Sequence, residues 1–256
     1  MPSEREETAA GATQHRNDMY GNIDARSEDD AGVAELIPAA TVVLLRDTPD
    51  GVEVLMLKKN SKITFGGMWV FPGGKIDAQD YLAPADVDAA ARCAAARETE
   101  EEAGLAVSVE EFVQIAHWTP PPGPQKRFAT WFFAAQVSGD QAIAIDDGEI
   151  KEHAWIRPQQ ALAKHAAGEI DLVPPTWVTL YHLARYNPAS AVLSHFQQRG
   201  QKTYRTRVVK AANGDRVALW RGDSGYDGWD ADIEGARHRL IMAQDGFRFE
   251  NTVEVY

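Results

Sequence analysis

Residues 69–105 contain, in close succession, a short apolar run, a Pro-Gly-Gly loop and a helix rich in alanine and glutamate. Trp69-Val70-Phe71 is typical of a strand end, and Pro72-Gly73-Gly74 predicts a tight loop whose glycines let the backbone approach a ligand closely. The helix is expected from Asp86 or Asp88, as N-cap, to Ala103, with Gly104 after its end. Any fold for this chain must therefore accommodate a strand, a glycine loop and a long helix in this order.

The rest of the chain divides into three regions by composition and pattern. Residues 1–36 are acidic and poor in large apolar side chains, so we expect a flexible tail. Residues 37–186 form the main domain, and residues 187–256 a β-rich extension. The expected strands and helices are strands at Ala39–Arg46, Val52–Lys58, Phe112–Trp118, Phe128–Val137, Thr203–Lys210, Arg216–Arg221, Arg239–Met242 and Phe247–Val255, and helices at Pro158–Gly168 and Trp177–Tyr186.

Composition excludes several classes of protein. The chain has 256 residues, of which 44% are hydrophobic and 25% charged, as in ordinary globular proteins. Its one cysteine, Cys93, excludes an intramolecular disulfide and argues against a cysteine-based zinc site. Apolar runs are far shorter than the roughly 20 residues that span a bilayer, and the N-terminus has no apolar signal core. We therefore expect a cytoplasmic protein without a membrane partner, and the net charge of −12 disfavours nucleic acid.

Three glutamates share one face near the end of the long helix. Glu98, Glu101 and Glu102 stand at positions i, i+3 and i+4. Their carboxylates repel one another and oppose the helix dipole, because they lie in the last two turns. A hard divalent cation bound through oxygen ligands would relieve this repulsion. The alternative is an acidic helix end that is simply solvated.

This segment resembles the Nudix box, G-x5-E-x7-R-E-U-x-E-E-x-G-U, where U is apolar. Thr99 stands at one apolar position. Counting back from the arginine puts Ala89 in place of the first glutamate, and Ala83 in place of the first glycine. Gly74, nine residues earlier, is the better glycine, which implies an insertion of that size. The matching residues are Arg97, Glu98, Glu101, Glu102, Gly104 and Leu105.

Further segments resemble the coenzyme A diphosphatase branch of that family. These are Gly67-x3-Phe71-Pro72-Gly73-Gly74, the basic stretch Lys58–Ile63, and Trp118-Thr119-Pro120 followed by Lys126–Phe133. Ile63, Ala129 and Trp131 depart from that branch. The family resemblance implies an α/β/α sandwich with a mixed sheet, and a hydrolase that cleaves the diphosphate of a nucleoside-diphosphate-linked metabolite with Mg²⁺ or Mn²⁺.

The resemblance also implies roles for individual residues. The helix glutamates and the Gly74 carbonyl would hold metal, with Glu101 as a third ligand or a water-orienting group, and Arg97 would hold the glutamates in place. Glu149 would act as a base or as an extra metal ligand from a loop before Trp155, and Glu152 is the alternative that its spacing makes less favoured. The expected set is Gly74, Glu98, Glu101 and Glu102 for metal, Glu101, Arg97 and Glu149 for catalysis, and Lys58, Trp69 and Arg127 for substrate.

Other functions stay open at this point. The substrate is coenzyme A or an acyl-CoA in the leading hypothesis, and ADP-ribose, NADH or a nucleotide sugar in the second. A non-catalytic nucleotide-sensing module is the third. The extension carries seven basic residues and only Asp215 as an acid between its first arginine and Arg221, which suits a phosphorylated substrate, the acidic tail of a second copy in a homodimer, or an edge strand protected from aggregation. The seven are Arg199, Lys202, Arg205, Arg207, Lys210, Arg216 and Arg221.

Overall fold

A computed structural model describes residues 32–61, 65–82, 86–123, 126–138, 141–146, 148–243 and 245–253. The expected tail lies outside these residues up to position 31, and so do Lys62 and Ile63 of the basic stretch. Within the described part of the chain, no helix is both long enough and apolar enough to cross a membrane.

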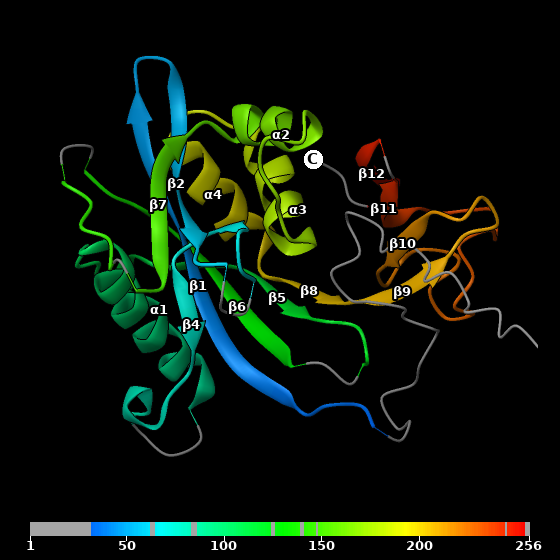
Figure 1. The fold of residues 1–256 in the computed structure, drawn as a ribbon, viewed down its shortest axis with the longest axis horizontal. Helices are drawn as coiled ribbons and strands as arrows, with labels where there is room; N and C mark the ends of the chain where they lie inside the picture. The colour runs from blue at the N-terminus through cyan, green and yellow to red at the C-terminus, as the bar shows by residue number, and fades with distance from the viewer. Residues whose placement is uncertain are drawn as a thin grey trace, which may run out of the picture.

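A mixed sheet of eight strands forms the centre of the molecule (Figure 1). The long strand β1 pairs in parallel with β6 along ten residues, and antiparallel with the hairpin strand β2. The sheet order is β3-β2-β1-β6-β5-β8, while β4 pairs with β1 and β7 with β2. The strands are β1 (Leu36–Thr48), β2 (Gly51–Lys59), β3 (Trp69–Val70), β4 (Gly73–Lys75), β5 (Val113–Thr119), β6 (Arg127–Gln136), β7 (Ile150–Ile156) and β8 (Lys202–Arg205).

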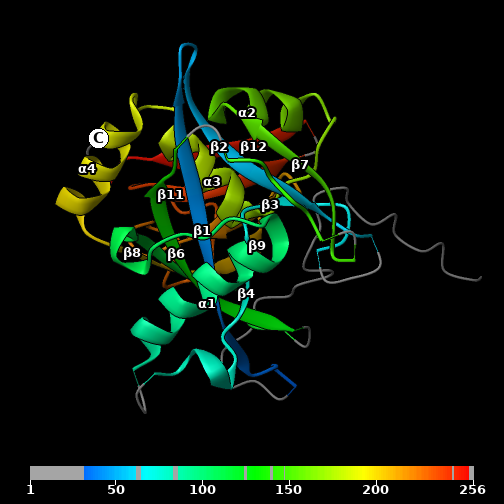
Figure 2. The same ribbon diagram turned by 90° about the vertical axis from the view of Figure 1, so that its left-hand side faces the viewer.

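Alternation along the strands sends side chains into two cores, one on each face of this sheet. Val42 and Leu44 of β1 pack with the alanines of α1 (Val87–Ala103), whereas Val43 and Leu45 pack toward the other helices. Those helices are α2 (Pro158–Ala166), α3 (Pro174–Leu183) and α4 (Ala189–Arg199). Figures 1 and 2 show α1 on one side of the sheet and α2–α4 on the other. The expected α/β/α sandwich with a mixed sheet is confirmed.

Helix α1 begins and ends as its sequence predicts. The Asp86 carboxylate accepts a hydrogen bond from the backbone N–H of Ala89 at 2.9 Å, which settles the choice of N-cap. Gly104 follows the helix with φ 66°, the left-handed conformation that glycine adopts without strain. Buried alanines along one side bring the helix close to the sheet, so the glutamates of its last turns lie beside the strands.

One edge of β1 is shared by two partners, and this places the glycine loop. Residues Ala39–Thr41 pair with β4, and residues Leu45–Thr48 pair with β2. Pro72, which precedes β4 in the sequence, lies beside β1 between these two stretches. Its carbonyl accepts hydrogen bonds from the Val42 N–H and the Thr41 hydroxyl. The partner of β1 therefore changes next to Gly73, and α1 packs across β4 at this place.

The extension is less separate, and less purely β, than its sequence suggests. Its first element is the helix α4, where the sequence predicts a β-rich region. The expected strand Thr203–Lys210 is divided at Thr206: β8 joins the main sheet, parallel to β5, and the following strand joins a second, antiparallel sheet. That sheet has the order β12-β11-β10-β9, with β9 (Arg207–Lys210), β10 (Arg216–Leu219), β11 (His238–Ala243) and β12 (Gly246–Asn251).

Aromatic stacking joins the extension to the main domain. Trp118 of β5 stacks on Tyr204 of β8 with 3.8 Å between ring centroids, and both contact Trp220 edge-on. All three side chains are buried in the core that also contains α3 and α4. The main domain and the extension thus share one core. The domain boundary expected at residue 187 stays a prediction.

A buried ion pair holds the long loop of the second sheet. Asp223 receives two hydrogen bonds from Arg239, at 2.6 and 2.7 Å, and both side chains are at most 5% exposed. Burial alone would raise the pKa of Asp223, but the hydrogen bonds from Arg239 and from two backbone N–H groups outweigh it, and the pKa lies below its ordinary value. The pair therefore stabilises the fold at neutral pH.

We expect Asp223→Asn to lower the free energy of unfolding at pH 7 by about 3 kcal/mol, because Arg239 is left buried without its counter-ion. Since the carboxyl pKa is lowered by folding, this contribution is present above about pH 4 and lost as the pH falls through the folded-state pKa. Urea unfolding at several pH values measures both effects. Asp227→Asn, at a fully exposed carboxylate 3.9 Å from Arg207, should change nothing, and an equal loss in both variants would contradict the prediction.

Candidate active site

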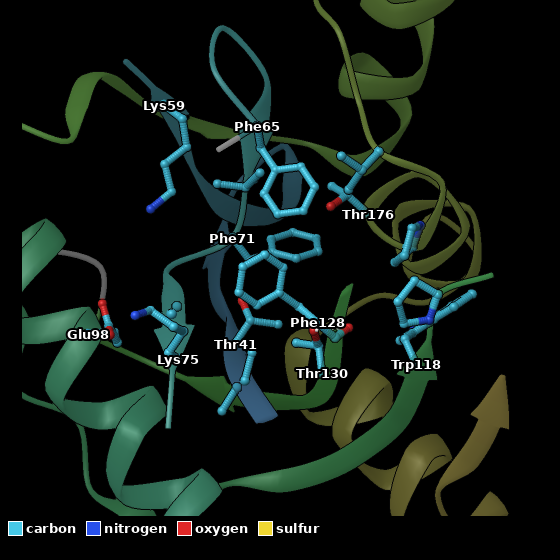
Figure 3. Close-up of a pocket in the computed structure, with 18 of the residues that line it drawn as sticks. Thr41, Lys59, Phe65, Phe71, Lys75, Glu98, Trp118, Phe128, Thr130 and Thr176 are labelled. Carbon is cyan, nitrogen blue, oxygen red and sulfur yellow. Dashed lines mark hydrogen bonds between the residues drawn. The ribbon is translucent and has the colours of Figure 1, made fainter. Parts of the chain in front are cut away.

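A cavity of about 840 Å³ opens where β4, α1 and the loops after β2 and β5 meet. The end beside α1 is lined by acidic and basic side chains, with Glu98 and Lys59 on one side of Figure 3. Phe65, Phe71 and Phe128 gather in the middle of the view, and Trp118 and Thr176 lie at the far side. The cavity therefore joins a charged end to an aromatic end.

Arg97 organises the charged end. Its guanidinium makes two hydrogen bonds to Asp80, both 3.0 Å, and further ones to Glu98 at 2.9 Å and Glu101 at 3.0 Å. It also donates to the Lys75 carbonyl of β4 at 3.1 Å. The hydrogen bonds that Arg97 donates to Asp80 are the largest influence on the Arg97 pKa and raise it, so the guanidinium stays charged. One arginine thus contacts both the helix glutamates and the backbone of β4.

Asp80 is the residue that the sequence analysis missed. It lies six positions after Gly74, where G-x5-E places the first acid of the box, and its side chain is only 3% exposed. Counting back from Arg97 reaches Ala89 instead. Ala89 lies in the first turn of α1, about two turns before Arg97. The insertion therefore follows the first acidic position rather than preceding it, and counting forward from Gly74 would have found Asp80.

Glu102 is the most buried of the three helix glutamates, with a side chain 4% exposed. One oxygen contacts the Lys59 ammonium, and the other accepts a hydrogen bond from the Gly73 N–H at 2.9 Å. Burial raises the pKa of Glu102 above its ordinary value, although Lys59 and the Gly73 N–H act in the opposite direction. Burial thus makes the Glu102 carboxyl harder to ionise than an exposed glutamate, even with Lys59 beside it.

Glu98 lies against the glycine loop. A Cβ on Gly74 would overlap the Glu98 carboxylate, so only glycine allows this approach. Burial is the main cause that raises the pKa of Glu98, the charge of Glu101 raises it further, and Arg97 opposes both. The donor set of carboxylates and backbone carbonyls is the one that Mg²⁺ and Mn²⁺ prefer.

In the described stretches, no three His, Cys, Asp or Glu side chains are arranged as a ready-made metal centre. The reason is visible in the contacts: the carboxylates of Glu98 and Glu101 point to Arg97, and that of Glu102 to Lys59. The residues expected to bind metal do lie together, and their neighbours are the cationic side chains of Arg97 and Lys59. Their role as ligands remains a prediction.

Glu149 lies at the cavity and Glu152 does not. The Glu149 carboxylate is 3.6 Å from the Lys59 ammonium and 61% exposed, whereas Glu152 pairs with Lys58 at 2.6 Å. Asp146, which the sequence analysis did not single out, also lines the cavity and accepts the Glu149 backbone N–H at 2.6 Å. This geometry favours Glu149 over Glu152 as the loop acid.

Of the three expected substrate contacts, only Arg127 lines the cavity. Its buried guanidinium donates to the backbone carbonyls of Pro120 and Pro121 at 3.0 and 2.9 Å, so it supports the proline loop. Lys58 and Trp69 lie outside the cavity lining, and Lys59 takes the place expected of Lys58. Strand alternation explains the exchange, since neighbouring side chains point to opposite sides.

Phe65 is the unusual residue of the aromatic end. Its φ is 61°, which is rare for a bulky side chain, and 40% of the residue is exposed. Its ring lies 6.0 Å from that of Phe128 across the cavity. A strained backbone that presents an aromatic ring to a cavity is typical of ligand-binding loops.

The ion pair between Asp80 and Arg97 is expected to stabilise the folded protein by a measurable amount. We expect Asp80→Asn to lower the free energy of unfolding by about 2–3 kcal/mol, because a buried charge pair is broken. Asp77→Asn is the matched control, since that carboxylate is 55% exposed and 3.9 Å from the same arginine; it should cost under about 1 kcal/mol. Equal effects of both variants in urea unfolding would contradict the role of Asp80.

Comparison with known proteins agrees with this geometry. The NUDIX domain model matches residues 35–175, more than half of the chain. Putative nudix hydrolase 7 of Caenorhabditis elegans is 26% identical over 183 residues, which are 57% of this chain and 59% of that relative. The chain thus spans about three fifths of that protein's length. A NUDIX hydrolase structure from Alicyclobacillus acidocaldarius superimposes with a TM-score of 0.58 at 23% identity, covering 63% of this chain and 96% of that one. The chain belongs to the Nudix family.

Proposed function

We propose that this protein is a divalent-metal-dependent hydrolase that cleaves the diphosphate of a nucleoside-diphosphate-linked metabolite. One observation carries the proposal: three helix glutamates, Glu98, Glu101 and Glu102, line a cavity that is large enough for such a ligand. Small-molecule sites commonly measure about 300–1,000 Å³. Membership of the Nudix family supports the same reaction class.

Each residue of the charged end has a task in this proposal. Mg²⁺ or Mn²⁺ held by Glu98, Glu102, Glu101 and the Gly74 carbonyl would supply positive charge to the phosphate oxygens. Arg97 keeps Glu98 and Glu101 oriented through the hydrogen bonds described above. Glu149, exposed at the cavity mouth, is the group that can take a proton from the attacking water.

The aromatic end bears on the identity of the second moiety of the substrate. Phe65, Phe71 and Phe128 offer apolar surface to a flat ring or an aliphatic arm. Among the substrates considered, we favour coenzyme A or an acyl-CoA, because it combines a nucleoside diphosphate with a long, partly apolar arm. The sequence resemblance of Trp118–Pro120 and Lys126–Phe133 to the coenzyme A diphosphatase branch supports the same choice.

A screen with purified protein tests the reaction and the substrate together. We expect turnover of coenzyme A esters with Mg²⁺ or Mn²⁺, and less turnover of ADP-ribose, NADH, dinucleoside polyphosphates and nucleotide sugars. Preferred turnover of ADP-ribose, NADH or a nucleotide sugar would favour the second hypothesis. Binding of nucleotide without any turnover would favour a sensing module.

Glu101→Gln and Glu102→Gln should each lower kcat on the best substrate by on the order of 100-fold or more, because each removes charge from the metal-binding face. Glu100→Gln is the matched control on the same helix, since Glu100 is exposed and is not among the residues that line the cavity. Steady-state kinetics on all three variants decides the matter. Metal-dependent hydrolysis that survives in both active-site variants would refute the proposal.

Phe65 provides a test of the aromatic end. We expect Phe65→Ala to raise KM by about tenfold with little change in kcat, because a ring contact of roughly 1–2 kcal/mol is lost from ground state and transition state alike. Phe65→Tyr should behave like the wild type. Ile233→Ala, which truncates an equally exposed apolar residue in the loop between β10 and β11, should change neither constant. A lower kcat with unchanged KM would show that Phe65 does not hold substrate.

A further inference from the structure

Lys58 and Lys59 are neighbours at the end of β2, where side chains alternate between opposite sides of the strand. The partner strand β7 has one extra residue here, because Lys58 pairs with Glu152 and Lys59 with Ile150. Lys58 points away from the cavity to Glu152, whereas the side chain of Lys59 is buried to all but 11% and lines the charged end. Neighbouring lysines of the same strand therefore have quite different surroundings.

The ammonium of Lys59 lies between two carboxylates. It contacts one oxygen of Glu102 directly and lies 3.6 Å from an oxygen of Glu149. The second oxygen of Glu102 is taken by the Gly73 N–H. Both oxygens of Glu102 thus have partners, so a cation that binds Glu102 must come close to the Gly73 N–H or to the Lys59 ammonium.

Electrostatics decides which partner can move. The Gly73 N–H belongs to a strand that pairs with β1, so its position is set by the sheet. The Lys59 side chain has four rotatable bonds, and a divalent cation next to its ammonium would repel it. Without any cation, the buried Glu102 would be an uncompensated charge, which is costly.

We propose that Lys59 is an internal counter-ion, which neutralises Glu102 until a divalent cation displaces it. The inference rests on the proposed metal-dependent function and adds a role for a residue outside the box. Lys59 keeps Glu102 oriented in the cavity and, by competing for the same oxygen, weakens metal affinity. When displaced, its ammonium lies within reach of Glu149 and of a bound phosphate group.

The test measures metal binding without substrate. Mn²⁺ binding to the full chain is followed at one fixed pH by the EPR signal of free Mn²⁺, and the melting temperature is recorded with and without Mn²⁺. In Lys59→Met we expect Mn²⁺ affinity to rise by on the order of tenfold. We also expect the melting temperature without metal to fall, and the increase on adding Mn²⁺ to be larger than in the wild type.

Two variants serve as controls. Lys58→Met removes the neighbouring lysine, which pairs with Glu152 outside the cavity, and should leave Mn²⁺ affinity unchanged. Lys59→Arg keeps the positive charge and should bind Mn²⁺ no more tightly than the wild type. Lys59→Gln replaces Lys59→Met if the latter does not fold, with the same expected direction.

The outcomes separate this inference from the proposed function. If the wild type binds Mn²⁺ and Glu102→Gln binds it more weakly, the metal site stands whatever Lys59 does. Equal or weaker Mn²⁺ affinity in the Lys59→Met or Lys59→Gln variant would then overturn the counter-ion alone, and would make Lys59 a permanent part of the site. Absence of Mn²⁺ binding in the wild type would overturn the metal-dependent function itself.

Discussion

The two hydrogen bonds between Arg97 and Asp80 hold the rest of the site together. Asp80 belongs to the chain that leaves β4, and Arg97 to the middle turns of α1, so this ion pair joins the glycine loop to the helix. The same guanidinium reaches Glu98 and Glu101. Because Arg97 cannot lose its charge in a protein, the acidic helix end keeps a fixed partner at any physiological pH.

The opening in the sheet supplies the second requirement, which is access. Strand β1 changes partner from β4 to β2, and Gly73 and Gly74 lie at this change. The backbone can then approach the helix so closely that Gly73 donates to Glu102 and Gly74 touches Glu98. A side chain at Gly74 would overlap the Glu98 carboxylate and push it away from the loop.

Two basic side chains at the charged end explain how four acidic side chains can lie close together there. Arg97 and Lys59 together neutralise part of the charge of Asp80, Glu98, Glu101 and Glu102, and burial raises the pKa of Glu98 and Glu102 all the same. In the function proposed above, the remaining negative charge attracts a divalent cation. The aromatic end offers apolar surface, which in the same proposal contacts the second moiety of the substrate.

The sequence by itself determined the elements and the chemistry of α1. Local signals suffice there: a carboxylate N-cap, a glycine after the last turn, and glutamates three and four residues apart. Only the tertiary structure decided which partners these residues meet. Asp80 faces Arg97 across an insertion, Lys59 rather than Lys58 lies in the cavity, and Arg127 supports the proline loop. Spacing from Gly74 points to Asp80, but which side of β2 faces the cavity and what Arg127 contacts depend on how distant segments pack.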